Sequence, residues 1–73
     1  MIRLLTFDTT HHALWAEEVA LERGFGVQVV PAPADADAKC DLALEFLPEE
    51  EAALTAALAD FDIPFKLYVR PEV

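Results

Sequence analysis

Apolar residues gather in short segments along the chain, and their spacing within each segment predicts its secondary structure. Residues 2–7 are apolar at nearly every position, which is typical of a strand buried in a sheet. Residues 27–30 are rich in valine and are followed by Pro31 and Pro33, so a second short strand is expected there. Residues 31–39 contain no large apolar side chain and are expected to form a loop.

Two further segments, residues 40–47 and 65–70, alternate between apolar and polar positions. A period of two residues is the pattern of a strand with one face on the core. The apolar positions are Leu42, Leu44, Phe46, Phe65, Leu67 and Val69. Cys40 has the same parity as the first three of these, so its sulfur is expected on the core side of the sheet.

Two segments have the spacing of amphipathic helices. Residues 11–23 follow the capping candidates Thr9 and Thr10 and end before Gly24, a typical helix stop. A second helix is expected from Pro48, because proline suits the first helical position and glutamates follow in the first turn, where the helix dipole favours them. Its apolar positions recur at Leu54, Leu58 and Phe61.

The predicted order of elements is strand, helix, strand, strand, helix, strand. This is the split βαβ, or ferredoxin-like, arrangement, an α+β sandwich in which a four-stranded antiparallel sheet carries both helices on one face. A chain of 73 residues allows a single domain of this kind, residues 1–73. The third strand then lies between the first and the second, so Cys40 is expected beside the turn of residues 8–12.

Charge and cysteine usage limit the environment and the partners. Five Lys and Arg against fourteen Asp and Glu give a formal net charge of −9, the wrong sign for binding phosphates, so neither nucleic acid nor a membrane is an expected partner. The chain has one cysteine and cannot form an internal disulfide, which favours a reducing cytosol. No signal peptide or membrane-spanning run is evident, so a soluble cytoplasmic protein is expected.

The predicted juxtaposition makes Cys40 the candidate reactive group, with Thr9, Thr10, His11 and His12 as the wall that faces it. A helix N-terminus and a nearby imidazolium are two surroundings that favour the reactive thiolate form of a cysteine. A second interpretation is equally open. Cysteine is among the most buried residue types and often behaves as a small hydrophobe, in which case Cys40 is structural.

Other chemistries have little support. His11 and His12 are adjacent, so on a helix they point about 100° apart and do not face one metal ion together. A mixed set of one histidine with Cys40 and Asp8 is a weaker alternative, and we expect no metal ion. No glycine-rich phosphate loop, Ser/His/Asp order or paired-carboxylate spacing is present, so no cofactor is expected, and a hydrolase or kinase is not indicated.

Three segments resemble the DUF3343 family of selenium/sulfur carrier-like proteins, and the resemblance covers nearly the whole chain. They are residues 6–14, which include Phe-x-Thr-Thr-His-x-Ala, the Pro-x-Pro of residues 31–33, and residues 40–46, in which Leu-Ala-Leu-x-Phe follows Cys40 and Asp41. The resemblance implies a carrier whose Cys40 holds a persulfide or a selenium adduct. The chain departs from the family pattern at Ala34, where arginine is common, and Lys39 is then the candidate cation; Asp41 stands where glycine is usual.

Two functions follow as hypotheses. The first is a cytosolic sulfur or selenium carrier acting through Cys40, with donor and acceptor proteins as partners, and the question of enzymatic turnover stays open. The second is a regulatory or interaction module that dimerises or binds a small ligand. A homodimer is expected in either case, because the sheet face away from the helices is predicted to present an apolar patch to solvent. The predicted patch contains Leu5, Phe7, Ala43 and Tyr68.

Overall fold

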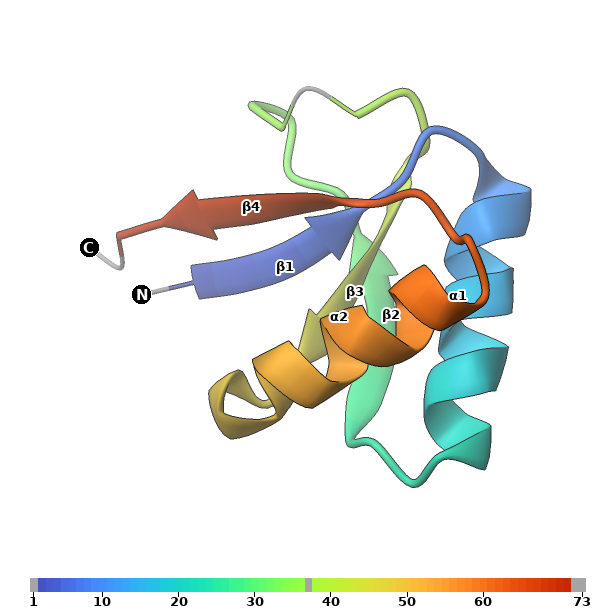
Figure 1. Cartoon of the computed structure of the whole chain (residues 1–73). Helices are drawn as coiled ribbons and strands as arrows, with labels where there is room; N and C mark the ends of the chain where they lie inside the picture. Colours follow the sequence, from blue (N-terminus) through green and yellow to red (C-terminus); the bar gives the residue numbers. More distant parts are fainter. Residues whose placement is uncertain (1, 37, 72–73) are drawn as a thin grey trace.

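Regular structure accounts for most of the computed structural model, which describes residues 2–36 and 38–71 (Figure 1). The elements, in chain order, are β1 (Ile2–Thr6), α1 (Thr10–Glu22), β2 (Val27–Pro31), β3 (Leu42–Phe46), the 3₁₀ turn η1 (Pro48–Glu50), α2 (Glu51–Asp60) and β4 (Lys66–Arg70). No helix in these two described ranges is long and apolar enough to cross a bilayer.

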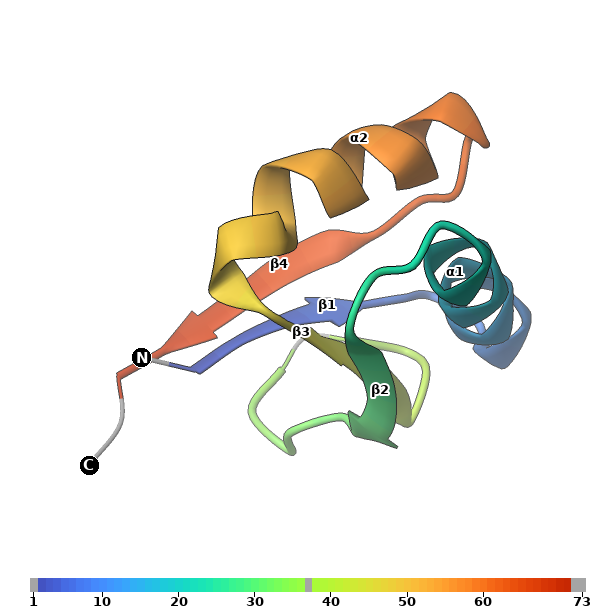
Figure 2. The ribbon, with the colours of Figure 1, turned by 90° about the horizontal axis from the view of Figure 1, so that it is seen from below.

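The four strands form one antiparallel sheet in the order β2-β3-β1-β4. Leu5 of β1 is opposite Leu44 of β3 on one side and Leu67 of β4 on the other. Both helices lie on the same side of this sheet in Figure 2. The predicted α+β, ferredoxin-like arrangement is therefore confirmed, with the third strand between the first and the second.

The core lies between the sheet and the two helices. Its buried residues are Leu5, Phe7, Ala13, Ala16, Val19, Ala20, Cys40, Leu44, Phe46, Leu54, Leu58 and Ile63. Small alanines on α1 let that helix approach the sheet closely, because they bring little side-chain volume to the contact. The cluster joins both helices to β1 and β3, the two central strands, and so fixes where α1 begins relative to the sheet.

The structure corrects the expected orientation of the β1 side chains. Leu5 and Phe7 were predicted on the face away from the helices, but both are buried in the core, 0% and 2% exposed. The residues of β1 that face away are Leu4 and Thr6, since side chains alternate along a strand. The near-continuous apolar run of residues 2–7 has no polar position to mark the outer face, so the parity was assigned wrongly.

The first helix begins as its capping residue predicts, and the second begins later than expected. The Thr9 hydroxyl accepts a hydrogen bond from the His12 amide at 3.1 Å, so Thr9 is the N-cap of α1, which starts at Thr10. The second helix does not start at Pro48 in α form, because η1 comes first and α2 follows from Glu51. Phe61, expected on its apolar stripe, caps the end of α2 and is 41% exposed.

Residues 32–36 and 38–41, between β2 and β3, lie on the side of the sheet opposite to α2 (Figure 2). Asp35 of this crossing segment accepts a hydrogen bond from the Tyr68 hydroxyl at 2.7 Å and forms an ion pair with Arg70 at 3.7 Å. Leu4 and Ala43 are buried although they face away from the helices. The predicted apolar patch is therefore covered in large part. This burial removes the argument for a homodimer, which stays a prediction.

Candidate functional site

Cys40 lies at the end of the crossing segment, next to the end of β1. Its amide donates a hydrogen bond to the Phe7 carbonyl at 3.3 Å, and the Ala32 amide donates to the Asp41 carbonyl at 2.7 Å. β3 begins only at Leu42, two residues later than predicted. The backbone of Cys40 thus belongs to the crossing segment, whereas its side chain, 4% exposed, belongs to the core.

Two groups contact the Cys40 sulfur as hydrogen-bond partners. The Leu42 amide donates to Sγ at 3.3 Å. The Thr10 Oγ1 lies 3.6 Å from Sγ, a separation at which either atom can donate. The structure therefore brings together Cys40 and the first residue of α1, which are thirty positions apart in the chain. The Leu42 amide was not foreseen, because a backbone donor leaves no mark in the sequence.

The other predicted site residues lie around this contact without joining it. Thr9 caps the helix, as described, and its hydroxyl is occupied by the His12 amide. The His11 ring is exposed and lies 5.8 Å from the His12 ring, centroid to centroid. Lys39 is exposed. In the part of the chain that the structure describes, none of these side chains hydrogen-bonds to the sulfur.

His12 has one unusual feature, since its Nδ1 is buried and has no hydrogen-bond partner. The ring as a whole is half-buried at the first turn of α1. A metal site is not formed around it: within residues 2–36 and 38–71 no group of three His, Cys, Asp or Glu side chains is placed to hold an ion.

The position of Sγ at the start of α1 determines its electrostatic surroundings. The first amides of a helix have no acceptor within the helix and carry a partial positive charge. Hydrogen bonds donated to a sulfur atom, and a helix N-terminus close to it, both stabilise negative charge there. The exposed carboxylate of Asp41 is a neighbour in sequence and has the opposite effect. The sulfur is buried in the core, with the Leu42 amide and the Thr10 hydroxyl against it.

Shifted pKa values occur at two ion-paired contacts away from Cys40. The hydrogen bond from Tyr68 lowers the pKa of Asp35, and the same bond raises the pKa of Tyr68. Arg3 binds Glu51 through two hydrogen bonds, of 2.6 and 2.9 Å, which lower the pKa of Glu51 and raise that of Arg3. The first pair holds the crossing segment to β4; the second holds the start of α2 to β1.

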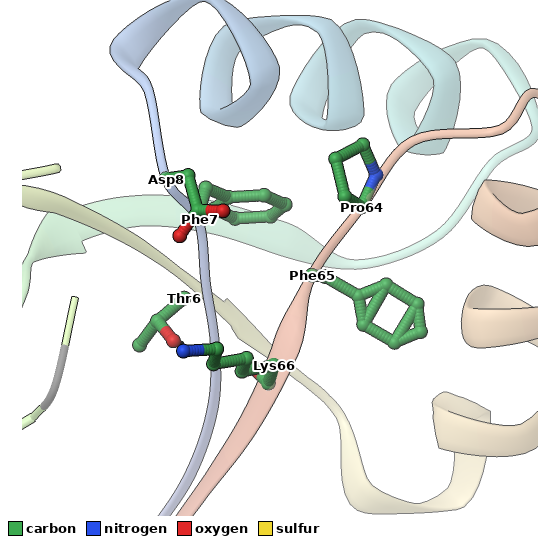
Figure 3. A pocket seen from close by; sticks show the side chains of 6 residues that line it. All are labelled: Thr6, Phe7, Asp8, Pro64, Phe65 and Lys66. Atoms are coloured by element: carbon green, nitrogen blue, oxygen red, sulfur yellow. The ribbon is translucent and has the colours of Figure 1, made fainter. Parts of the chain in front are cut away.

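Two hollows lie near the start of α1 and were not predicted. One, of about 130 Å³, lies where β1 and β4 separate, and six residues line it: Thr6, Phe7, Asp8, Pro64, Phe65 and Lys66 (Figure 3). The other, of about 280 Å³, is a surface hollow on α1 lined by His11, Leu14, Trp15 and Glu18. Phe7 connects the first hollow to the backbone of Cys40, because the Phe7 carbonyl accepts a hydrogen bond from the Cys40 amide.

A comparison with protein families matches nearly all of the chain. A family model described as "Putative Se/S carrier protein-like" covers residues 3–70, which include all the strands and helices except Ile2 of β1, and also Cys40. No curated protein and no solved structure matches the chain significantly. The family match and the geometry around Cys40 therefore have to be interpreted together.

Proposed function

The chain belongs to the Se/S carrier protein-like family, and we propose that it holds its cargo, a sulfur or selenium atom, on the sulfur of Cys40. One observation carries this assignment of the site. The single cysteine of the chain has its Sγ in contact with the Leu42 amide and the Thr10 hydroxyl at the start of α1. A hydrogen-bond donor and a helix N-terminus beside a thiol are typical surroundings of reactive cysteines.

Loading on Cys40 is an exchange that needs no added oxidant. The Cys40 thiolate attacks the outer sulfur of a donor persulfide, R–S–SH. A bond forms between Sγ and that sulfur, the donor S–S bond breaks, and the donor leaves as the thiol R–SH. Attack on R–S–SeH gives the selenium adduct in the same way. Unloading is the reverse exchange with an acceptor thiol, so the protein carries the atom without consuming it.

Burial of Cys40 requires a movement before either exchange, because a side chain that is 4% exposed is not accessible to a partner protein. The proposal places this movement in residues 38–41. Among the described residues, the backbone of that stretch is held by the Cys40 amide on Phe7 and the Asp41 carbonyl on Ala32, and the crossing segment is held further along by the contacts of Asp35 with β4. The Cys40 side chain has to leave the core and its contacts with Thr10 and Leu42. Local opening of a lightly held segment is less costly than unfolding the core.

The proposal includes a reducing, cytosolic location and protein partners that present thiols. A single free thiol is stable in a reducing compartment, and its persulfide is exchanged there by other thiols. The formal charge of −9 favours partners with a basic surface, since opposite charges accelerate encounter. Such steering weakens as salt concentration rises.

A loading experiment tests the proposal. The reduced protein is incubated with a low-molecular-weight persulfide, separated from it, and analysed by intact mass and by peptide mapping after alkylation. We expect one added sulfur, a gain of ~32 Da on the Cys40 peptide, in an amount that a thiol reductant removes. Cys40→Ser is the control and should gain nothing. A wild-type protein that stays unmodified in excess donor would contradict the proposal and favour a structural cysteine.

A further inference from the structure

The hollow between β1 and β4 has a position that the sheet itself dictates. The two strands are paired as far as Thr6 with Lys66. Beyond that pair β1 continues through Phe7 to Asp8, and β4 is preceded by Pro64 and Phe65, so the two chains separate. The space of about 130 Å³ that they leave is lined by both. It is not part of the Cys40 site, although Phe7 contributes to both.

The lining of this hollow is divided into a polar and an apolar part. In Figure 3 the side chains of Thr6 and Lys66 point to one side of β1, whereas the rings of Pro64 and Phe65 lie on the other. The Phe7 ring, 2% exposed, is fixed in the core, and Phe65 packs against the core from outside. The Phe7 ring is therefore closed to a ligand, and Pro64, which is exposed, is the apolar residue of the lining that a ligand can reach most readily.

Hydrogen-bonding capacity is left over at the polar part. Thr6 is 3% exposed, and among residues 2–36 and 38–71 its hydroxyl forms one hydrogen bond, of 3.5 Å, to the Lys66 carbonyl. That distance is beyond the usual range for a hydroxyl donor, which is about 2.5–3.0 Å. A buried hydroxyl without a good partner is uncommon, because leaving it unpaired costs stability.

Opposite charges stand at the two ends of the hollow. Asp8 lies towards the start of α1 and Lys66 lies on β4, and both side chains are exposed (Figure 3). Among residues 2–36 and 38–71 neither forms an ion pair or a side-chain hydrogen bond. A simple anion would meet the repulsion of Asp8, and a simple cation that of Lys66. A ligand with both charges satisfies both groups.

We propose that this hollow binds a small α-amino acid as its zwitterion. Its ammonium group faces Asp8, its carboxylate faces Lys66 and the Thr6 hydroxyl, and its small side chain lies against Pro64. The volume is below the roughly 300–1,000 Å³ of pockets for drug-sized ligands, which excludes nucleotides and large cofactors. Binding here is independent of the Cys40 chemistry and goes beyond the proposed carrier function.

A titration followed by nuclear magnetic resonance tests the site on the full chain. L-alanine is added to the ¹⁵N-labelled protein, and we expect saturable shifts centred on the amides of Phe7, Phe65 and Lys66. Acetate and methylammonium are the matched half-ligands, and each should bind more weakly than alanine. Saturation by acetate alone with equal affinity would overturn the zwitterion and indicate an anion site.

Variants locate the binding. Lys66→Met and Asp8→Asn should each weaken alanine binding about tenfold or more, since each removes a charge-assisted contact. Arg23→Met and Asp60→Asn make the same charge changes elsewhere on the surface and should leave the affinity unchanged. Each spectrum also reports whether the variant is folded. No saturable shift in the wild type, or equal affinities in all four variants, would contradict the proposal.

Discussion

The two faces of the sheet are covered in different ways. The helix face is closed by side chains of α1 and α2 that interlock with Leu5 and Leu44, both 0% exposed. The opposite face is crossed by residues 32–36 and 38–41, most of which have short side chains, and Asp35 connects this segment to β4. The helix face supplies the stability of the fold. The crossed face supplies the segment that, in the proposed function, opens without unfolding the rest.

Cys40 lies where these two coverings meet. Its sulfur is in the helix-side core, so it shares the rigid surroundings of Thr10 and Leu42. Its backbone is in the crossing segment, so it can leave those surroundings when the segment opens. The function that we propose for Cys40 requires both conditions, because a carrier thiol is held under donors while loaded and reaches a partner at transfer.

The largest effect on stability is expected when one leucine is removed from each face of the sheet. Leu44→Ala removes a fully buried side chain between the sheet and the helices and should lower the free energy of unfolding by about 2–5 kcal/mol. Leu4→Ala, on the crossed face, should cost less, because the segment above it can settle into the space. Denaturant unfolding measures both. Equal losses would show that the two faces are packed alike.

A smaller effect separates the two threonines at the start of α1. Thr9→Ala removes the N-cap and should cost ~1 kcal/mol, with little change in Cys40 reactivity. Thr10→Ala removes the hydroxyl that touches Sγ and should slow alkylation of Cys40 by iodoacetamide, with a smaller loss of stability. Unfolding and alkylation measured on both variants give the comparison. If Thr9→Ala slows alkylation as much as Thr10→Ala, the Thr10 contact has no special role.

Releasing the crossing segment should expose the thiol. Asp35→Asn weakens the contacts with Tyr68 and Arg70, and we expect Cys40 to be alkylated several-fold faster in the native protein. The effect is limited because contacts between exposed groups are weak. Glu45→Gln makes the same carboxyl-to-amide change at another exposed position and is the control. An unchanged rate in Asp35→Asn would place the opening elsewhere.

The same contact has a pH dependence with a definite sign. The hydrogen bond from Tyr68 lowers the pKa of Asp35, so its contribution is present above the unfolded value of ~3.9 and is lost as pH falls through the folded pKa. The bond raises the pKa of Tyr68, so that contribution is present below ~10 and is lost as pH rises through the folded pKa. The hydrogen bond between Asp35 and Tyr68 therefore contributes fully to stability between about pH 3.9 and about pH 10, and its contribution falls outside this range.

The single tyrosine makes this measurable by absorbance. The tyrosinate signal should appear at higher pH in the wild type than in Asp35→Asn, because the hydrogen bond to Asp35 raises the pKa of Tyr68. Glu45→Gln should titrate like the wild type. A wild-type midpoint equal to that of Asp35→Asn would mean that the bond does not form in solution.

The contact of Cys40 with the start of α1 was predictable from the sequence, because it follows from the strand order. The face of the sheet on which each β1 side chain lies was harder to predict. Placing β3 beside β1 is enough to bring Cys40 to Thr10, thirty residues away. The outer face of β1 was assigned wrongly because residues 2–7 have no polar alternation. The hydrogen bond between Asp35 and Tyr68 was not predictable, since an aspartate in a loop has no regular spacing that would indicate its partner. Nor does a sequence show that the Leu42 amide points at a sulfur.

The central claim is that an atom is transferred from Cys40 to an acceptor, and one measurement tests it most directly. The protein is loaded from a persulfide, freed of donor, and mixed with an excess of a small acceptor thiol while the adduct on the Cys40 peptide is followed by mass. We predict that the gain of ~32 Da disappears in a single exponential, matched by persulfide on the acceptor, and that Asp35→Asn transfers faster. An adduct that forms and then persists in the presence of acceptor, or that never forms on Cys40, would contradict the account.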